Sequence, residues 1–353
     1  MKNKISVYII FVILTANILC TKISANNNLY NNIITVGEIE QIIDGIVVSQ
    51  QESMKVSSID EFINKGLAKY AGTSLSDWFV IALRQYKESF GYSFDGYLSA
   101  LDKYVKNTAN LNATDTQRIS LAYAALYNKI VADNNVADKI VTDKIVTNKT
   151  DRNEFISKAL DASIGKLGIM SYIYGLLLLD CNDYTSDRFT RDEVLNDILS
   201  LRLEDGGWAL MGDVSDPDIT AMTVQALAPY YEKNNIKPII DEALTLLSEK
   251  QLEDGDYSSW GTRNAETAAQ VIVALCALGI DCQRDERFIK NGNTLIDGLL
   301  EYRLSDGSFS HTPDGLSDSS ATAQTMYSLV AVWRQMNGLS VLYDFTADDI
   351  VSE

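Results

Sequence analysis

The stretch that organises this sequence is LRLEDGGW (residues 201–208), because the chain contains two further versions of it. Each version is a polar turn with an Asp-Gly step and an aromatic residue two positions after the glycine. The three are LRLEDGGW (201–208), KQLEDGDY (250–257) and EYRLSDGSF (301–309). Their turn glycines Gly206, Gly255 and Gly307 are 49 and 52 positions apart, and a nearly constant interval of this length indicates an internal structural repeat.

Each turn is followed at a nearly fixed distance by an apolar segment, for example AQVIVAL from Ala269. More divergent segments of the same kind, such as SDWFVIAL from Ser76, occur earlier in the chain. Apolar residues at helical spacing therefore predict six helix pairs. The pairs are 58–70 with 75–88, 94–106 with 114–130, 152–160 with 165–180, 190–203 with 217–232, 238–251 with 265–280, and 291–303 with 319–337.

The two helices of each pair differ in polarity. First helices such as EVLNDILSLRLE carry a polar face, whereas second helices such as TAAQVIVALCALG are apolar nearly all round. A helix that is apolar all round must be buried. The sequence therefore predicts an all-α fold, an (α/α)6 toroid of six helix hairpins, in which the second helices form an inner ring and their N-termini surround a central cavity.

Helix start signals agree with this assignment. A capping box pairs a Ser or Thr with a Glu or Gln three residues later, so that each side chain satisfies a backbone N–H of the other. Three such pairs precede predicted helices, and they are Ser58 with Glu61, Thr114 with Gln117, and Thr190 with Glu193.

The composition limits the partners that the chain can have. Its 46% hydrophobic content is ample for a large core. With 30 Lys and Arg against 48 Asp and Glu, the formal net charge is -18. A surface of this charge repels nucleic acids and anionic lipids, so we expect neither as a partner.

The N-terminus has the pattern of a secretory signal peptide. Lys2 and Lys4 precede an apolar run from Ile5 to Leu19, and Ala25 offers a small residue for cleavage. The alternative is an uncleaved anchor, for which the run is short. We therefore expect cleavage near Ala25, a secreted, extracellular protein, and no transmembrane segment after cleavage.

Three cysteines remain beyond this segment, and they are Cys181, Cys276 and Cys282. One disulfide with one leftover thiol is an open alternative, but Cys276 lies in an apolar helical run and is expected to behave as a small core residue. Because the chain has no CxxC pair, a cysteine zinc site is not supported. We expect no metal and no cofactor.

The predicted organisation has four parts. Residues 1–25 are the signal peptide, 26–55 an N-terminal segment, 56–340 the toroid, and 341–353 an acidic tail. Residues 131–150 form a low-complexity run of V-x-D/N-K units, which we expect to be an exposed insertion in the toroid.

The turns resemble the Q-x-x-D-G-x-W motif of the prenyltransferase and squalene-oxidase repeat family. Gln251, Asp254 and Gly255 match this motif, with Tyr257 in the aromatic position. The other two turns match with an arginine where Gln is usual. The resemblance covers residues 56–340, and its layout is most similar to secreted, single-toroid bacterial members.

This resemblance implies a terpenoid cyclase-like α/α toroid, but toroids of this type serve several unrelated reactions. Protein prenyltransferases use a zinc cluster of Asp, Cys and His, whereas the only histidine here is His311 and Cys276 has no neighbouring Asp. The chain has no Cys-Gly-Glu-Gln run of a thioester domain. A cobalamin carrier would need a second domain from a partner.

Class II terpene cyclases supply a more specific comparison. The segment DPDITAM (216–222) resembles their D-x-D-D-T-A motif, with Asp218 in the place of the proton donor and Asp216 as its companion, but Ile219 stands where the motif has a third Asp. The competing interpretation is helix capping, with Asp216 as N-cap, Pro217 at the first helical position and Asp218 opposing the helix dipole. We favour capping and keep Asp218 and Asp216 as candidate catalytic residues.

Five further residues are candidates for contacting a ligand at the cavity mouth. They are Trp208, Tyr257, Trp260, Glu266 and His311. The competing interpretations are packing between helix layers for the aromatic residues and a solvated loop position for His311. Glu266 occupies the repeat position of Asp218, and Trp260 is the best candidate for lining the mouth.

The sequence leaves three functions open. The favoured one is a secreted binding protein that holds an apolar or amphiphilic ligand, or a partner chain, in the cavity mouth. The alternative is a terpenoid cyclase-like or prenyltransferase-like enzyme with Asp218 as general acid. The third is a surface-interaction module with an inert cavity. Binding is favoured over catalysis because prenyl diphosphates are made inside cells.

Overall fold

The computed structural model of the chain describes residues 33–87, 91–133 and 142–346. The predicted signal peptide, part of the predicted insertion and the last residues of the acidic tail lie outside these ranges. No helix within the described ranges is long and apolar enough to cross a membrane.

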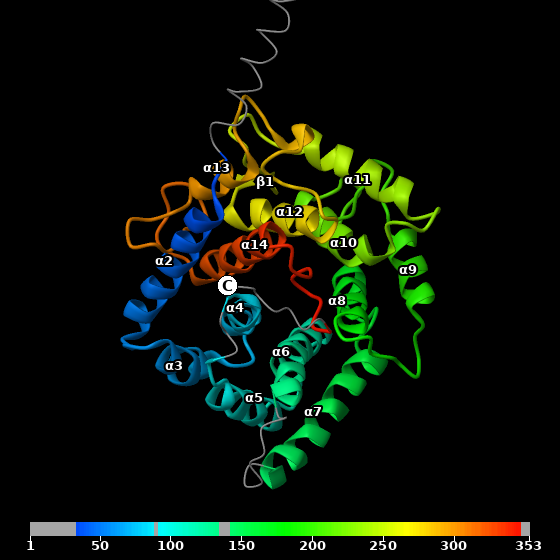
Figure 1. Cartoon of the computed structure of the whole chain (residues 1–353). Coiled ribbons are helices and arrows are strands. Elements are labelled where there is room, and N and C mark those ends of the chain that lie inside the picture. Colours follow the sequence, from blue (N-terminus) through cyan, green and yellow to red (C-terminus); the bar gives the residue numbers. More distant parts are fainter. Residues whose placement is uncertain (1–32, 88–90, 134–141, 347–353) are drawn as a thin grey trace, which may run out of the picture.

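Within the described residues, six helices surround the centre of the molecule and form an inner ring (Figure 1). Each contacts the next, and the last closes the ring on the first. They are α4 (Ser74–Gln85), α6 (Ala113–Asp133), α8 (Gly168–Asp180), α10 (Pro217–Leu227), α12 (Ala265–Ala277) and α14 (Ser319–Met336). The predicted all-α (α/α)6 toroid is confirmed.

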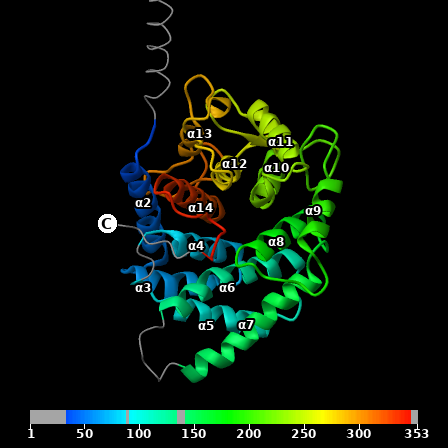
Figure 2. The same ribbon diagram turned by 45° about the vertical axis from the view of Figure 1, so that its right-hand side comes forward.

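A second layer of helices surrounds this ring, and Figure 2 shows the molecule in an oblique view. The outer helices are α2 (Val36–Met54), α3 (Ile59–Glu61), which continues into η1 (Phe62–Gly66) and η2 (Leu67–Tyr70), α5 (Asp95–Asn107), α7 (Thr142–Ala162), α9 (Arg191–Ser200), α11 (Lys237–Lys250) and α13 (Leu295–Leu300). Shorter elements lie in the connections, namely η4 (Ala228–Tyr230), β1 (Ser258–Ser259), β2 (Thr262–Arg263) and η5 (Glu286–Phe288).

Two of the three predicted helix starts hold at least in part. Thr190 and Glu193 form a complete capping box at α9. At α3, Ser58 accepts a hydrogen bond from the backbone N–H of Glu61, but the Glu61 carboxylate accepts from Ser57 instead of Ser58.

The third predicted capping box, at Thr114 and Gln117, is wrong, although the helix itself begins close to the predicted position, at Ala113. Asn112 takes the capping role, because its Oδ1 accepts from the backbone N–H of Asp115 at 2.8 Å. Gln117 is buried and donates to the carbonyl of Ser171 on α8 at 2.7 Å. A buried amide needs a hydrogen-bond partner. The Gln117 side chain therefore bonds to the neighbouring helix α8 instead of capping its own helix.

The second and third Asp-Gly turns each lie against the backbone of another outer helix. Gly255 has a φ of +87°, and a Cβ at this position would lie 2.1 Å from the carbonyl oxygen of Thr294, at the start of α13. Gly307, with a φ of +88°, approaches the backbone of Gly45 on α2 in the same manner. The turn at Gly307 therefore packs against α2, the first helix within the described residues.

Because the turn at Gly307 packs against it, helix α2 belongs to the outer layer. Its buried face includes Ile39, Ile43 and Ile46, and the helix packs against α14 and η1. Residues 36–54 thus cover the junction between the last and the first repeats, although the repeat pattern of the sequence begins after them.

Candidate functional site

A cavity of about 180 Å³ lies at the N-terminal ends of the inner helices, where the toroid prediction places a hollow. Most of its lining comes from α8, α10, α12 and α14, with one residue from α4. The lining residues are Trp78, Met170, Tyr174, Leu177, Asp218, Ile219, Met222, Gln225, Glu266, Gln270, Gln324, Tyr327 and Tyr343. We call this the N-terminal cavity.

Helix geometry explains which side chains point inward. Residues four positions apart lie on one face of a helix. Asp218 and Met222 face the cavity from α10, and Glu266 and Gln270 face it from α12. Because Asp218 and Glu266 occupy the same repeat position, the repeat brings two carboxyl groups to one cavity.

Asp216 has the capping role that the sequence favours for it. Its Oδ1 accepts hydrogen bonds from the backbone N–H groups of Asp218 at 2.9 Å and Ile219 at 3.4 Å. Its Oδ2 accepts from the hydroxyl of Ser259 at 2.6 Å. Asp216 does not line the N-terminal cavity, so its carboxylate starts the helix and positions the residue next to the cavity.

Asp218 is in a different environment. Its Oδ1 is out of contact with solvent and has no hydrogen-bond partner among the described residues. Burial raises the pKa of Asp218 to about 6, and the Asp216 and Glu266 carboxylates add to this rise, against the hydroxyls of Thr267 and Ser259. A buried acceptor without a partner costs about 1–3 kcal/mol. The cavity therefore holds a carboxyl group that can carry a proton at mildly acidic pH.

Glu266, the second carboxyl group, is held by the predicted ligand residue His311. The His311 Nδ1 lies 3.0 Å and 2.9 Å from the two carboxylate oxygens of Glu266. Only 14% of the Glu266 side chain is exposed, against 53% for His311. Burial raises the pKa of Glu266 overall, and the hydrogen bond from His311 offsets only part of this rise. Within the described ranges, no group of three or more His, Cys, Asp or Glu is arranged to hold a metal ion.

Three glutamines form a hydrogen-bonded chain along one wall. Gln225 donates from Nε2 to the carbonyl and to the Oε1 of Gln270, both at 2.9 Å. Gln270 donates to the Oε1 of Gln324 at 2.9 Å and to the hydroxyl of Tyr327. These residues are not among those predicted from the sequence, although a glutamine within an otherwise apolar inner helix is a detectable signal.

Aromatic rings line another part of the cavity. Trp78 on α4 lies 5.6 Å from Tyr174, 6.1 Å from Tyr327 and 6.4 Å from Tyr343 between ring centroids. Burial raises the pKa of Tyr174 to about 12 and that of Tyr343 further. These hydroxyls therefore stay neutral and can both donate and accept hydrogen bonds.

The remaining predicted ligand residues do not line the cavity. Trp208 and Tyr257 are fully buried, and they donate to the carbonyls of Ile198 and Leu247 at 2.8 Å and 2.7 Å. They pack between the helix layers, which is the competing interpretation of the aromatic turn residues. Trp260 is 67% exposed and lies with a φ of +53° between β1 and β2.

The raised pKa of Asp218 makes a prediction about stability. The folded protein binds the proton of Asp218 more tightly than the unfolded chain does, because the pKa rises from 3.8 to about 6. This stabilisation is fully present below pH 3.8 and is lost as the pH rises through about 6. Asp218→Asn removes the titrating group, so the variant should be more stable than the wild type at pH 7, by at most about 3 kcal/mol, and equal to it near pH 4.

Urea unfolding at pH 4, 5, 6 and 7 measures this difference. Asp213→Asn, in an exposed loop, removes the same charge and should show no such dependence. An Asp218→Asn difference that stays constant between pH 4 and pH 7 would contradict the assigned shift.

Comparison with known proteins gives a likeness in structure but not in sequence. The chain matches no known protein family and no curated protein. Its structure is similar to that of a possible member of the GH105 family from Salmonella enterica subsp. enterica serovar Paratyphi A, with a TM-score of 0.55 and 10% identity over 86% of this chain and 96% of that chain.

Two other solved structures are similar to the same degree. An α-1,6-mannanase, GH76A of Salegentibacter sp., has a TM-score of 0.53 and 11% identity over 84% of this chain and 99% of that chain. The unsaturated glucuronyl hydrolase of Bacillus sp. GL1 has a TM-score of 0.53 and 13% identity over 88% of this chain and 99% of that chain. These identities are low, so the likeness establishes the α/α toroid as the class of fold.

Proposed function

We propose that this chain is an acid–base enzyme that acts on a hydroxyl-rich ligand, such as a terminal sugar, in the N-terminal cavity. The observation that carries this proposal is the Oδ1 of Asp218, a buried carboxyl oxygen without a partner in a group whose pKa is raised to about 6. A general acid works best when its pKa lies near the operating pH.

The chemistry requires two carboxyl groups in different protonation states. Protonated Asp218 donates its proton to the oxygen of the leaving group as the bond from that oxygen to the sugar carbon breaks. Ionised Glu266, held by His311, faces the positive charge that develops on the sugar or accepts a proton from the attacking water. This division of roles is the general pattern of glycoside hydrolysis.

The size and lining of the cavity support a small polar ligand. Its volume of about 180 Å³ is below the range of roughly 300–1,000 Å³ that is typical of drug-sized ligands. Amide groups from Gln270 and Gln324 can bind hydroxyls, and the ring of Trp78 can pack against the face of a sugar. Two of the similar structures are those of a mannanase and a glucuronyl hydrolase, which supports a carbohydrate as the substrate class.

The same lining disfavours the terpenoid cyclase alternative. A cyclase must hold a carbocation in an apolar cavity, whereas Glu266 and the three glutamines present oxygen atoms that would capture it. The acid motif also has Ile219 in place of its third aspartate. Membership of the prenyltransferase and squalene-oxidase repeat family remains a proposal that rests on the turn motifs.

Secretion is part of this proposal. It rests on the pattern of residues 1–25 and on a strongly acidic composition, and it would place the enzyme where extracellular carbohydrate is available. Recovery of the chain from the culture medium with an N-terminus near residue 26 would test it.

A second candidate is the binding protein for an amphiphilic ligand or partner chain that the sequence favours. It is supported by exposed apolar side chains in the three loops that lead to the inner-helix N-termini. They are Leu210, Met211, Val214, Trp260 and Leu316. A ligand that bound here would cover these side chains without needing Asp218.

Turnover of sugars by wild-type protein and Asp218→Asn tests the proposed function. We expect hydrolysis of at least one member of a panel of α-1,6-mannooligosaccharides and unsaturated glucuronyl disaccharides, with kcat/KM falling above pH 6. Loss of the proton donor should lower kcat by about 100-fold or more, whereas Asp213→Asn should not change it. Retention of an amphiphile without turnover of any sugar would favour the binding protein instead.

A further inference from the structure

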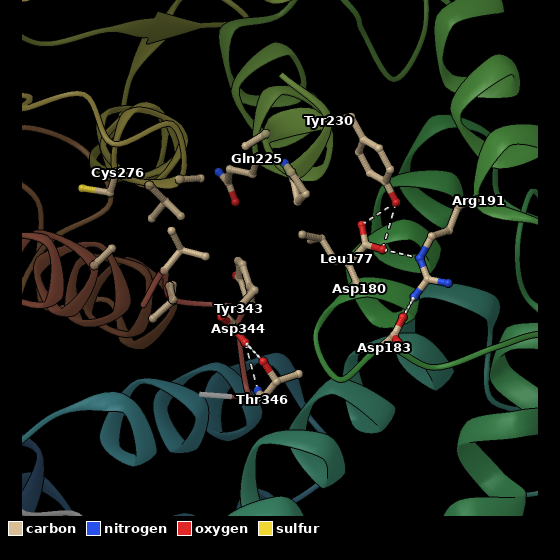
Figure 3. Close-up of a pocket in the computed structure, with 17 residues that line it drawn as sticks. Leu177, Asp180, Asp183, Arg191, Gln225, Tyr230, Cys276, Tyr343, Asp344 and Thr346 are labelled. Atoms are coloured by element: carbon tan, nitrogen blue, oxygen red, sulfur yellow. Dashed lines mark hydrogen bonds and ion pairs between the residues drawn. The ribbon is translucent and has the colours of Figure 1, made fainter. Parts of the chain in front are cut away.

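A second and larger cavity lies at the opposite ends of the inner helices. Its volume is about 600 Å³, within the range of roughly 300–1,000 Å³ that is typical of small-molecule sites. Leu177, Gln225 and Tyr343 line both this cavity and the N-terminal cavity, so Tyr343 lies between the two. We call it the C-terminal cavity (Figure 3).

The walls of the C-terminal cavity are mainly apolar. Val273 and Ala277 of α12 and Ala331 of α14 face it, together with Ala228 at the end of α10. The small side chains leave the space open, and atoms that line an open space lack partners for dispersion contacts. An aliphatic ligand would supply those contacts.

The chain after α14 forms one wall of this cavity and crosses the ring in Figure 1. Hydrogen bonds to backbone groups of this segment attach it to α4 and to the residue that follows α8. The Nε2 of Gln85 on α4 donates to the carbonyl of Leu342 at 2.8 Å, and the N–H of Phe345 donates to the carbonyl of Cys181 at 2.8 Å. The segment is therefore a fixed part of the wall.

One side of the C-terminal cavity is polar and has an excess of negative charge. Figure 3 shows Arg191 between Asp180 and Asp183, and it binds them at 2.7 Å and 2.9 Å. Tyr230 donates to Asp180 at 2.9 Å. A third acid, Asp344, accepts from the backbone and hydroxyl of Thr346.

This arrangement leaves negative charge unbalanced. Arg191 is the one basic residue among those that line the cavity, against three aspartates. Asp344 takes part in no ion pair among the residues that the structure describes. The excess, on a chain with a net charge of -18, favours a cationic group and disfavours an anionic one.

We propose that the C-terminal cavity binds a small amphiphile with an aliphatic body and a primary ammonium head. The body lies between α10, α12 and α14 and the segment after α14, and the head lies beside Asp344. The site is separate from the N-terminal cavity, and it does not depend on the proposed function of Asp218.

Calorimetric titration with decylammonium and decyl sulfate, both below micelle formation, tests the charge preference. The two probes share one alkyl chain and differ in the sign of the head. We expect decylammonium to bind at least tenfold more tightly than decyl sulfate. Equal affinities, or tighter binding of decyl sulfate, would overturn the proposal.

Substitutions of two residues that line the C-terminal cavity test whether decylammonium binds there. Ala331→Phe fills the cavity and should abolish decylammonium binding, with the folded state checked by circular dichroism. Asp344→Asn keeps an acceptor for Thr346 and should weaken binding about fivefold, the size expected for one partly exposed charge. Asp314→Asn, in an exposed loop, makes the same charge change and should leave affinity unchanged, as should Asp218→Asn.

Hydrogen exchange gives a second measure that does not depend on Ala331→Phe folding. Bound decylammonium should slow exchange of the Phe345 amide in the wild-type protein and slow it less in Asp344→Asn. Decylammonium binding that is the same in Asp344→Asn and Asp314→Asn, without protection of Phe345, would show that the alkylammonium binds elsewhere on the acidic surface.

Discussion

Gly255→Ala is expected to lower the free energy of unfolding by more than about 4 kcal/mol, a size that is exceptional for a single methyl group. The left-handed conformation of Gly255, with a φ of +87°, accounts for about 1–2 kcal/mol. The larger part is steric, because the new Cβ would lie 2.1 Å from the carbonyl oxygen of Thr294 and 3.0 Å from its carbon. Both atoms are backbone, so the second turn would have to leave α13.

Gly261→Ala is the matched control. Gly261 has a φ of +78°, but a Cβ there would meet nothing within 4 Å, so only the conformational cost of about 1–2 kcal/mol applies. Urea unfolding of the two variants separates the cost of the backbone conformation from the cost of the steric clash with α13. If Gly255→Ala costs no more than Gly261→Ala, the turns do not hold the repeats together.

Asp77→Ala is expected to cost about 3–5 kcal/mol, because it leaves the buried guanidinium of Arg118 without one of its two carboxylate partners. Asp77 is fully buried on α4. Its Oδ2 accepts from the Nε of Arg118 on α6 at 2.9 Å, and its Oδ1 accepts from the backbone of Gly72 at 2.9 Å and the hydroxyl of Tyr97 on α5 at 2.5 Å. One carboxylate therefore joins two inner helices and one outer helix.

The double variant Asp77→Ala/Arg118→Met separates the stranded charge from the lost contacts. Removal of the cation should recover part of the stability lost in Asp77→Ala, since a guanidinium that has lost its buried carboxylate no longer has to be buried. Urea unfolding of the wild type and both variants measures this recovery. A double variant less stable than Asp77→Ala would mean that Arg118 stabilises the ring mainly through its other contacts, to Asp115 and the Gly72 carbonyl.

The buried cluster around Asp77 illustrates a limit of sequence reasoning. In the sequence, Ser76 and Asp77 look like polar residues at the start of an apolar helix, where an acid usually opposes the helix dipole. Nothing local indicates that Arg118, 41 positions later, reaches the same carboxylate. Likewise, the failed capping assignment at Thr114 and Gln117 follows from a contact between α6 and the neighbouring inner helix α8.

For the candidate site too, the sequence identified some of the residues, and only the structure identified the others. The repeat alignment identifies Asp218 and Glu266 as equivalent positions, and both line the N-terminal cavity. It does not show that Trp208 and Tyr257, which recur at equally regular positions in the sequence, lie outside the cavity. The structure places these two buried rings between the helix layers. The glutamine chain was also missed, because its members matter only when three neighbouring helices bring them together.

The helix pairs, their order and the closed double-walled ring follow from the sequence, because apolar periodicity and the Asp-Gly turns are local signals that recur in each repeat. The sequence also favoured Asp216 as the N-cap, but only the tertiary structure shows that Asp218, in the wall of a cavity, has a buried oxygen without a partner. The tertiary structure also decided that α2 completes the outer layer and that the chain after α14 divides the central space into two cavities. These features depend on burial and on contacts between residues far apart in the chain, and such contacts leave no periodic trace in the sequence.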